Sequence, residues 1–255
     1  MSVVDFRCGS SFHDGREVPY PTHSIVFVRR GVFRRAAGND WLVADPNQVL
    51  FFNAAQPYRY EHPLPGGDDC TILTLQTSRA LELVTAHAPR DAERPEAPFP
   101  LGHALGSGRV ARLHYELLLL LRHGAPRLAV EDTLAELADG SLSAAYGRKD
   151  LAAGGAAARR QHDLVEAAKL ELNRCIASPP SLGQMADALD CSPFHHSRIL
   201  SHSEGLRLRS YLGRLRARLA AERLLQGTRD LTELALDLGY SDHSHFTNAF
   251  RRAWG

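Results

Sequence analysis

Residues 231–252 have the sequence LTELALDLGYSDHSHFTNAFRR in a chain of 255 residues. This pattern predicts a short apolar helix, a turn, and a second helix with a polar outer face. Ala235 is small enough for two helices to cross steeply at close range. Gly239 suits a left-handed turn residue, and Asp242 suits the N-cap of the second helix. The stretch therefore predicts a helix-turn-helix unit.

The same pattern occurs once more, 49 residues earlier in the chain. The apolar positions of the first helix match pairwise between the copies: Leu182, Met185, Ala186 and Leu189 against Leu231, Leu234, Ala235 and Leu238. Ser192 and Pro193 suit the N-cap and the first helical position of the earlier second helix. One such unit is as typical of a self-packed helical bundle as of a DNA-binding domain, whereas two in tandem favour DNA binding.

Further short motifs surround both units: Ser181-Leu182, Ser197-Arg198, Glu204-Gly205, Tyr211-Leu212, Arg214-Leu215-Arg216, Leu224-Leu225, Gly239-Tyr240-Ser241-Asp242, His245-Phe246 and Phe250-Arg251-Arg252. With these motifs, residues 162–255 closely resemble the AraC/XylS family of transcription activators. The resemblance implies an all-α domain of two helix-turn-helix subdomains joined by one long helix at 208–225. It also implies that the two reader helices enter successive major grooves ~34 Å apart.

The resemblance places base-reading positions on both reader helices: Phe194, Ser197 and Arg198 on the first, and His243, Ser244, Thr247 and Asn248 on the second. Arginine can bind guanine and asparagine adenine through paired hydrogen bonds, and phenylalanine can contact a thymine methyl group. The alternative for each is a phosphate contact or a local cap. Nearby arginines are expected to contact phosphates or to be solvated or salt-bridged: Arg209, Arg214, Arg216 and Arg251.

One departure from the family concerns the C-terminus. Family members usually continue past the position of Gly255 with a Pro-containing helix, whereas this sequence stops at Trp254-Gly255. We therefore expect either a shortened chain or a second subdomain that does without that helix.

The front part of the chain has a different pattern. Short β-branched or aromatic runs at 25–28, 41–43, 49–52 and 71–75 alternate with turn signals, which predicts a small antiparallel barrel or sandwich. Apolar residues at three- and four-residue steps then predict a helical hairpin at about 107–146. Residues 147–160 suit a linker. We therefore predict two domains, 1–146 and 161–255.

The front domain also resembles the cupin-like effector and dimerisation domain of the same family, through His23, Gly31, Asp45-Pro46-Asn47, Phe51-Phe52-Asn53 and Pro57. Candidates for an effector pocket are His23, Phe27, Phe52 and Tyr60, with an apolar core role as the alternative. An enzymatic cupin needs paired histidines and a carboxylate for a metal. Because Tyr58 occupies a common barrel histidine position, we expect no catalytic residues, bound metal or other cofactor.

Cys8, Cys70 and His62 are the remaining reactive side chains of this region. A thiolate assisted by histidine would respond to oxidants, so Cys8 and Cys70 are redox candidates, and with His62 they could hold Zn(II) or Cu(I). The alternative is that both cysteines are inert core residues.

Charge and hydropathy restrict the partners. Residues 156–255 hold 14 Lys and Arg against 11 Asp and Glu, whereas the front part holds 16 against 18. No run approaches the ~20 apolar residues of a membrane span, and the start lacks a secretion signal, so we expect a cytoplasmic protein without membrane contact. The expected partners are double-stranded DNA, a small-molecule effector, RNA polymerase, and a second copy through the leucine stripe of helix 110–121. Packing of that stripe on its own barrel is the alternative.

The resulting hypothesis is a sequence-specific DNA-binding transcription regulator, not an enzyme, that an effector or redox event in the front domain controls. A metal-dependent cupin enzyme with a nucleic-acid-binding module is the second hypothesis. A non-specific architectural DNA protein is disfavoured, since the reader helices are polar and varied and not uniformly basic.

Overall fold

A computed structural model describes residues 1–9, 17–38, 40–147, 156–189 and 205–254. The front part consists of strands and a few helices: β1 Ser2–Cys8, β2 Val18–Pro19, β3 His23–Gly31, β4 Phe33–Ala37, β5 Asp40–Ala44, β6 Gln48–Phe52, β7 Pro57–Glu61, β8 Asp68–Leu75, α1 Thr77–Thr85, η1 Asp91–Glu93, β9 His103–Leu105, α2 Gly108–Arg122 and α3 Arg127–Tyr146. The remainder is helical: α4 Ala156–Arg174, α5 Leu182–Ala188, α7 Leu208–Leu225, α8 Leu231–Asp237 and α9 His243–Trp254.

The strands form two antiparallel sheets, with orders β1-β8-β3-β6-β9 and β2-β7-β4-β5. The four predicted runs lie in β3, β5, β6 and β8. The predicted class, a β-rich front part followed by an all-α part, is confirmed; the strands form two sheets that are not closed into one barrel, which is broadly consistent with the cupin-like description. The sequence did not predict β1, because its side chains are mostly exposed and lack the alternation of a half-buried strand.

Alternation along the buried strands divides the front core into two layers. In β3, Ile25 and Phe27 face the helices, whereas Val26 and Val28 face the second sheet. β6 repeats this division with Phe51 on the helix side and Phe52 between the sheets. A strand that is apolar on both faces is typical of a sheet covered on both sides.

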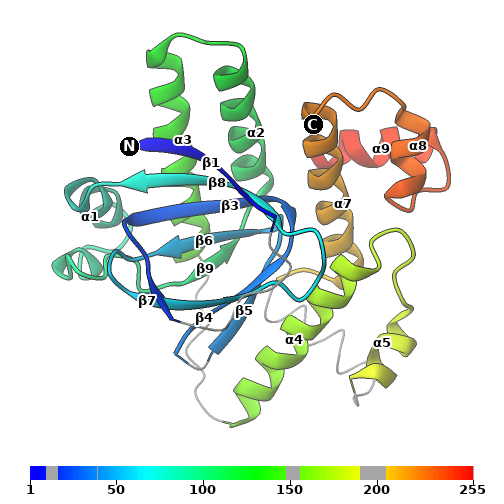
Figure 1. Cartoon of the computed structure of the whole chain (residues 1–255), viewed down its shortest axis with the longest axis horizontal. Helices are drawn as coiled ribbons and strands as arrows, with labels where there is room; N and C mark the ends of the chain where they lie inside the picture. The colour runs from blue at the N-terminus through cyan, green and yellow to red at the C-terminus, as the bar shows by residue number, and fades with distance from the viewer. Residues whose placement is uncertain (10–16, 39, 148–155, 190–204, 255) are drawn as a thin grey trace.

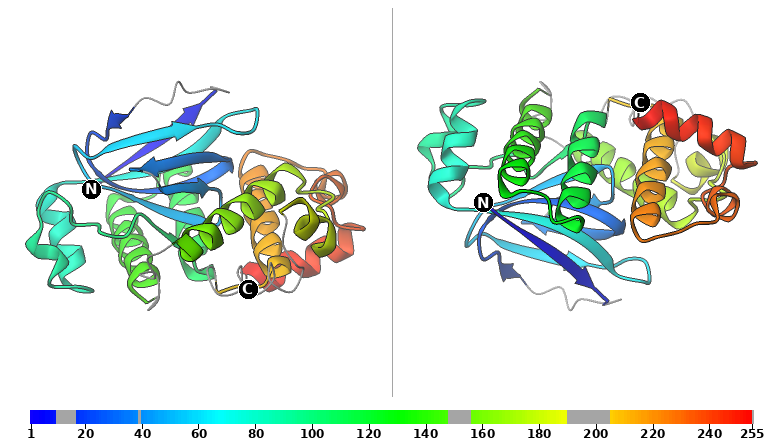
Figure 2. Two further views of the ribbon diagram at one scale, coloured as in Figure 1. Left: turned by 90° about the horizontal axis from the view of Figure 1, so that it is seen from below. Right: turned by 90° about the horizontal axis from the view of Figure 1, so that it is seen from above.

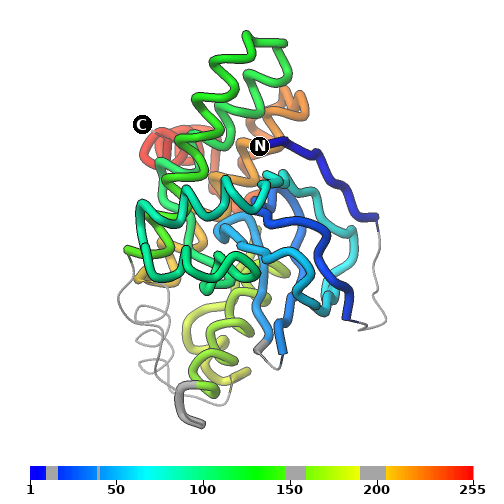
Figure 3. Tube along the Cα trace, turned by 90° about the vertical axis from the view of Figure 1, so that its left-hand side faces the viewer, coloured from blue at the N-terminus to red at the C-terminus, as the bar shows by residue number. Residues whose placement is uncertain are grey.

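The predicted helical hairpin consists of α2 and α3. The side chain of Ser107 accepts a hydrogen bond from the Val110 N–H and so caps α2. In the predicted leucine stripe, Val110 and Leu117 are buried in the core of their own domain. The hairpin tip stands clear of the strands (Figure 3) and exposes Leu119, Leu121 and Leu128.

The last part of the predicted linker at 147–160 is helical, because α4 begins at Ala156. Alanine is the strongest helix former, and Ala156, Ala157 and Ala158 extend the helix toward the front domain. Residues 148–155 lie outside the described residues, so the domain boundary itself stays a prediction. The predicted long helix at 208–225 coincides with α7.

Figure 1 shows how the helices of the second part adjoin the sheets. α7 lies beside the strands, α8 lies on its far side, and the end of α9 passes α7 and contacts α2, where Trp254 packs against Tyr115. The views from below and above in Figure 2 show α4 running along the same side of the sheets toward α5 and α7. Among the described residues, no helix is long and apolar enough to cross a membrane.

Candidate nucleic-acid interface

The turn between α8 and α9 explains the glycine of the starting motif. Gly239 has φ +76°, and a Cβ on it would lie 2.0 Å from the Ala177 carbonyl oxygen, so any side chain there would collide with backbone. Ala235 is completely buried where α8 meets α9. Tyr240 is buried beside Phe246. The unit thus has the crossing geometry that the sequence predicted.

Asp242 caps the second reader helix. Its carboxylate accepts a hydrogen bond of 2.7 Å from the His245 N–H. This bond from the backbone lowers the pKa of Asp242 below its usual value, followed by the bond from the Ser241 hydroxyl. The cap fixes where α9 begins, and therefore which residues form its first two turns.

The outer face of α9 carries the predicted base-reading residues. His243, Ser244 and Asn248 are exposed, and Thr247 is half-buried. The opposite face carries Phe246, which is buried in the core of this subdomain. Ser244 and Asn248 therefore lie on the face away from Phe246, whereas His243 is exposed at the start of the helix, one turn before Phe246.

The first reader helix, with Phe194, Ser197 and Arg198, lies outside the described residues. The helix before it is described: Ser181 and Gln184 form a reciprocal capping box at the start of α5, and Met185 and Ala186 are buried. Small Ala186 thus has the same buried position in α5 as Ala235 in α8.

The four predicted phosphate contacts have different surroundings. Arg209 and Arg251 are exposed, and burial lowers the pKa of half-buried Arg214. Arg216 donates hydrogen bonds of 3.0 and 2.8 Å to the Ile176 carbonyl and lies 5.4 Å from the centre of the Tyr240 ring. Arg216 therefore joins the two subdomains, which leaves Arg209 and Arg251 most accessible to phosphate.

The front domain meets α4 through buried polar groups. Lys169 is completely buried and donates a 2.8 Å hydrogen bond to Glu166, whose other oxygen accepts the Val43 N–H of β5. Burial raises the pKa of Glu166, and Lys169 opposes that shift. One acid on α4 thus connects a strand of the front domain with a lysine of its own helix.

Asp45 forms a second buried contact between the two parts of the chain. Its carboxylate accepts hydrogen bonds of 2.8 Å from Asn173 of α4 and 2.9 Å from the Tyr211 hydroxyl of α7. Asn47 returns a 3.0 Å bond to the Tyr211 carbonyl. Burial raises the pKa of Asp45, and its hydrogen-bond donors oppose this.

Arg218 of α7 enters the front domain. Its guanidinium donates hydrogen bonds to the carbonyls of Pro46, at 2.5 Å, and Gly106, at 2.6 Å. Burial lowers the pKa of Arg218 to about 10, so the group remains charged at neutral pH. The Tyr115 hydroxyl of α2 donates a 2.8 Å bond to the Arg218 backbone carbonyl. Arg218 is thus a structural residue between the domains.

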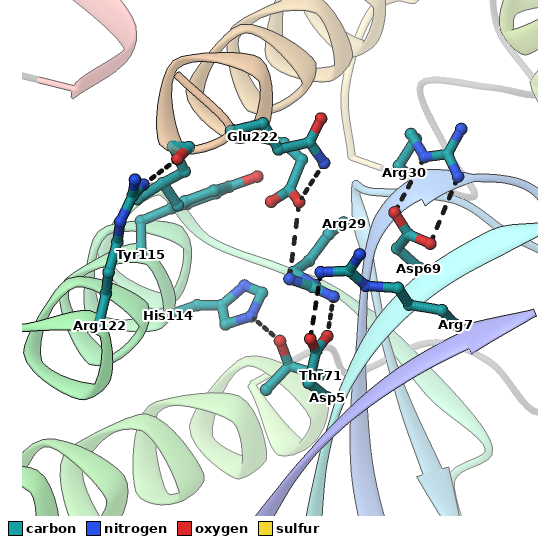
Figure 4. A network of polar contacts seen from close by, with 12 residues as sticks. Asp5, Arg7, Arg29, Arg30, Asp69, Thr71, His114, Tyr115, Arg122 and Glu222 are labelled. Atoms are coloured by element: carbon teal, nitrogen blue, oxygen red, sulfur yellow. Dashed lines mark hydrogen bonds and ion pairs between the residues drawn. The ribbon is translucent and has the colours of Figure 1, made fainter. Parts of the chain in front are cut away.

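A third set of contacts joins β1, β3 and α7 (Figure 4). Arg29 forms an ion pair with Asp5 and lies 3.6 Å from Glu222 of α7. Burial raises the pKa of Glu222, and Arg29 opposes that shift. Within the described residues, Arg29 Nε and Glu222 Oε2 have no hydrogen-bond partner. We call Arg29, Asp45, Glu166, Lys169, Arg218 and Glu222 the junction.

His114 lies beside the junction (Figure 4). Its ring hydrogen-bonds the Thr71 hydroxyl at 2.8 Å and stacks 4.7 Å from Phe27. Burial lowers its pKa to about 3, with smaller contributions from Arg29 and Arg218. A cavity of about 10 Å³, room for about one water molecule, lies between His114, Phe27 and Arg218.

The predicted effector residues do not line one space. Phe52 and Tyr60 lie together between the sheets, with ring centres 6.4 Å apart. Phe27 faces the helices and the junction cavity. His23 is buried at the start of β3, where it accepts a 3.2 Å hydrogen bond from the Ala54 N–H and burial lowers its pKa.

The predicted redox residues lie close to one another in the front domain. Cys8 is half-buried at the end of β1, and Cys70 is buried at the start of β8. Burial raises the pKa of the Cys70 thiol well above its usual value, which disfavours a reactive thiolate there. His62 hydrogen-bonds Asp68, the residue to which the Cys70 thiol also donates.

Sequence reasoning missed most of the junction. One signal was present: Lys169 follows Val165 by four residues and precedes Leu172 by three, so a lysine occupies the apolar face of α4. Such a position indicates a buried partner. Arg29 and its partner Glu222, and Arg218 and its partner Pro46, are more than 100 residues apart in sequence, and no local pattern identifies these pairs.

Comparisons with known proteins agree with this geometry. Residues 185–255 match the family model of a helix-turn-helix domain. The chain is similar to ToxT from Vibrio cholerae, at 12% identity over 99% of this chain and 94% of that one, with TM-score 0.35. It is also similar to ToxT from Vibrio cholerae O395, at 11% identity over 98% of this chain and 92% of that one, with TM-score 0.39.

The AraC-like transcriptional activator CuxR is also similar, at 17% identity over 82% of this chain and 69% of that one, with TM-score 0.35. TM-scores below 0.5 do not by themselves establish a shared arrangement of the elements. The family match instead concerns the region with the two-copy pattern, the capped α9 and the buried small alanines. Residues 185–255 therefore match a helix-turn-helix domain model of the AraC type, in the region where the motifs of the sequence predicted such a domain.

Proposed function

We propose that this protein is a sequence-specific DNA-binding transcription regulator whose front domain controls its reader helices. The observation that carries this proposal is α9, which a family-matched helix-turn-helix domain presents with its polar residues outward. Ser244 and Asn248 lie four residues apart and share that face, from which side chains could reach base edges in a major groove.

Control by the front domain is supported by the junction. Buried polar contacts attach α4 and α7 to the strands, so a change in the strands shifts helices on which both reader units are built. Buried polar groups without partners cost free energy, and Arg29 Nε and Glu222 Oε2 are such groups within the described residues. The contact between β3 and α7 therefore leaves two buried polar atoms unpaired, and an effector that offered them partners could compete with this contact.

The interior between the two sheets favours an acidic effector. Arg35 is buried there, with its guanidinium carbon 4.7 Å from the centre of the Phe52 ring and 5.1 Å from that of Tyr58. Its terminal nitrogens donate hydrogen bonds of 2.8 and 2.9 Å to the Phe51 and Gly102 carbonyls. Among the described residues no carboxylate pairs with it and its Nε has no hydrogen-bond partner, and burial lowers its pKa. A bound carboxylate would supply the missing counter-charge. Small carboxylic acids should raise the melting temperature, and the matching amides should not.

Dimerisation through α2 is a further part of the proposal. The apolar residues available for it are Leu119 and Leu121 near the end of α2 and Leu128 of α3, since the predicted stripe is largely used inside its own domain. The Leu119→Glu variant should shift a dimer to a monomer in sedimentation. An RNA polymerase contact would be tested by transcription in vitro on a selected operator.

The surroundings of His23 and Tyr58 favour the regulator hypothesis over the enzymatic one. An enzymatic cupin would use the positions of His23 and Tyr58 for a metal. Here His23 accepts the Ala54 N–H, and the Tyr58 hydroxyl accepts the Asn53 N–H at 3.1 Å. Both side chains thus serve to fix the loop after β6.

Selection of duplexes from a randomised library tests the proposal. The purified full chain should enrich a two-part motif that spans about two turns of DNA. Asn248→Ala should relax one base position, whereas Arg127→Ala, on the exposed hairpin, should leave the motif unchanged. Recovery of no motif by the wild-type chain would overturn the proposal.

A further inference from the structure

Three strand ends bring metal-binding side chains to one corner of the front domain. Cys8 ends β1, His62 directly follows β7, and Asp68 begins β8. The antiparallel register places Cys8 directly opposite Asp68. Cys70 lies two residues after Asp68, hence on the same face of β8. Residues from both sheets and from three strands therefore meet at this corner.

The distances in this cluster are short. One ligand atom from each of Cys8, His62 and Asp68 lies within 4.8 Å of the other two. His62 Nε2 is 2.6 Å from Asp68 Oδ1, and the Cys70 thiol donates to Asp68 Oδ2 at 3.1 Å. The side chains of His62 and Asp68 are only 3% and 4% exposed, whereas Cys8 is half-buried. The cluster is therefore enclosed on most sides and reachable from the side of Cys8.

Two glycines make this close approach of the strands feasible. A Cβ on Gly67 would lie 1.7 Å from the Cys8 carbonyl oxygen, and a Cβ on Gly31 would lie 2.0 Å from the Gly67 carbonyl oxygen. Both glycines have positive φ, +64° and +79°, which other residues adopt at a cost. The backbone thus holds Cys8 next to Asp68. A preorganised binding site requires such an arrangement before the ligand binds.

We propose that Cys8, His62 and Asp68 bind one Zn(II) ion, with the Cys70 thiol positioning the Asp68 carboxylate and solvent as the fourth ligand. Zinc accepts sulfur, nitrogen and oxygen ligands in a tetrahedron at ~2.0–2.3 Å. The carboxylate favours Zn(II) over Cu(I), which prefers sulfur ligands. Nitrogen and oxygen ligands of such a site lie ~3.4 Å apart, so His62 and Asp68 must separate by less than about 1 Å.

Zinc binding at this site exchanges protons and transfers no electrons. The Cys8 thiol loses its proton as the Zn–S bond forms, and the proton shared between His62 and Asp68 leaves when both coordinate the ion. The metal therefore competes with protons for all three ligands. The affinity for zinc is expected to increase with pH.

A chain of contacts connects this site with α7. That zinc acts on α7 through these contacts rests on the proposed function. Cys8 lies on one face of β1 and Asp5, three residues earlier, on the other. Asp5 pairs with Arg29, which lies 3.6 Å from Glu222 of α7 (Figure 4). Zinc that holds the end of β1 therefore strengthens the attachment of α7 to the front domain.

A zinc titration of the reduced, metal-free full chain tests the site directly, with a coloured chelator as competitor. One equivalent of Zn(II) should bind. Cys8→Ser and His62→Gln should each weaken binding by more than about 100-fold, and Cys70→Ala, which removes the donor to Asp68, by about 10- to 100-fold, as loss of a supporting contact does. Cys175→Ser is the control, since this thiol directly follows α4 and lies beside Glu171, and it should bind zinc like the wild type.

Cobalt(II) in place of zinc gives an independent readout. The wild-type complex should show the sulfur-to-cobalt charge-transfer band, and Cys8→Ser should lack it while keeping the wild-type melting temperature without metal. Absence of stoichiometric zinc binding, or unchanged affinity in Cys8→Ser, would overturn the proposal. Because both measurements omit DNA, their outcome is separate from that of the duplex selection.

Discussion

Helices α4 and α7 differ from the α8–α9 unit in the chemistry of their surroundings. α4 and α7 carry Lys169, Glu166, Arg218 and Glu222, all buried; Lys169 pairs with Glu166, and the other three have partners in the front domain. α8 and α9 pack through an apolar core around Leu234 and Phe246 and keep the polar residues of the first turns of α9 outside. The first region is thus held to the front domain by buried polar groups, whereas the second touches it at the end of α9, where Trp254 packs edge-on against Tyr115 of α2.

This difference shows where control can enter the DNA-binding domain. Apolar packing inside α8–α9 keeps the reader unit in one shape whether or not the front domain changes. Buried polar contacts depend strongly on exact geometry, because a charge that loses its partner in the interior is costly. The free energy of the junction contacts therefore changes steeply with small displacements of α4 and α7. The α8–α9 unit is expected to move with these helices as one body.

The largest expected effect comes from breaking the junction at its most buried charge. Lys169→Ala leaves Glu166 buried without its cation, which should lower the free energy of unfolding by about 3–5 kcal/mol. Urea denaturation measures the change. Arg127→Ala, in an exposed pair with Glu131, is the control and should leave stability nearly unchanged. If both variants lowered the free energy of unfolding equally, the contrast between the buried junction and an exposed ion pair would be refuted.

The exposed face of α9 should affect specificity without affecting stability. Asn248→Ala should lose about 1–3 kcal/mol of discrimination at one base pair, as loss of a paired hydrogen bond to adenine does. Competition binding with single-base variants of the selected operator measures this. The same variant should unfold like the wild type, since Asn248 is exposed. A large loss of stability would indicate that this face is packed.

Lowering the pH should reduce the contribution of His114 to the free energy of unfolding. Its pKa is about 3 in the folded protein against 6.5 unfolded, so the unfolded chain binds the extra proton between these values. The stability contribution is complete above pH 6.5 and declines by about 1.4 kcal/mol per unit as pH falls toward 3. Urea melts at several pH values should show a shallower decline for His114→Gln. If the free energy of unfolding fell with the same slope against pH in both proteins, a lowered pKa of His114 would be contradicted.

The smallest effect is expected at Arg251. If this exposed side chain contacts a phosphate, Arg251→Ala should weaken binding to all duplexes alike and reduce the slope of log K against log salt by about 0.9. Arg216→Ala is the informative comparison, because Arg216 bonds the Ile176 carbonyl and its loss should lower stability first. Binding isotherms at several salt concentrations separate the two arginines.

Much of the helical domain could be predicted from local sequence. The α8-turn-α9 unit follows from short-range periodicity, caps and one glycine, all within a few residues of one another, whereas the long helix at 208–225 was an implication of the family resemblance. The exposed positions of Ser244 and Asn248 follow from the same periodicity, since both lie on the face of α9 away from Phe246. The first reader helix, with Arg198, stays a prediction outside the described residues.

The front domain could be predicted only in part. Its buried strands β3, β5, β6 and β8 have a strong apolar signal, whereas β1 is an exposed edge strand and has none. The effector candidates show the limit most clearly. Phe27 and Phe52 are similar residues in neighbouring strands, yet alternation places them on opposite faces of the sheet.

The sequence by itself determined the kind of each domain, the reader unit and its outward-facing side chains, because helix periodicity and capping act over a few residues. Only the tertiary structure decided that Arg218 is buried in the front domain, that Arg29 meets Glu222, and that Cys8 lies beside His62 and Asp68. Those contacts join residues far apart in the chain. Their partners are set by how sheets and helices pack, which no local pattern records.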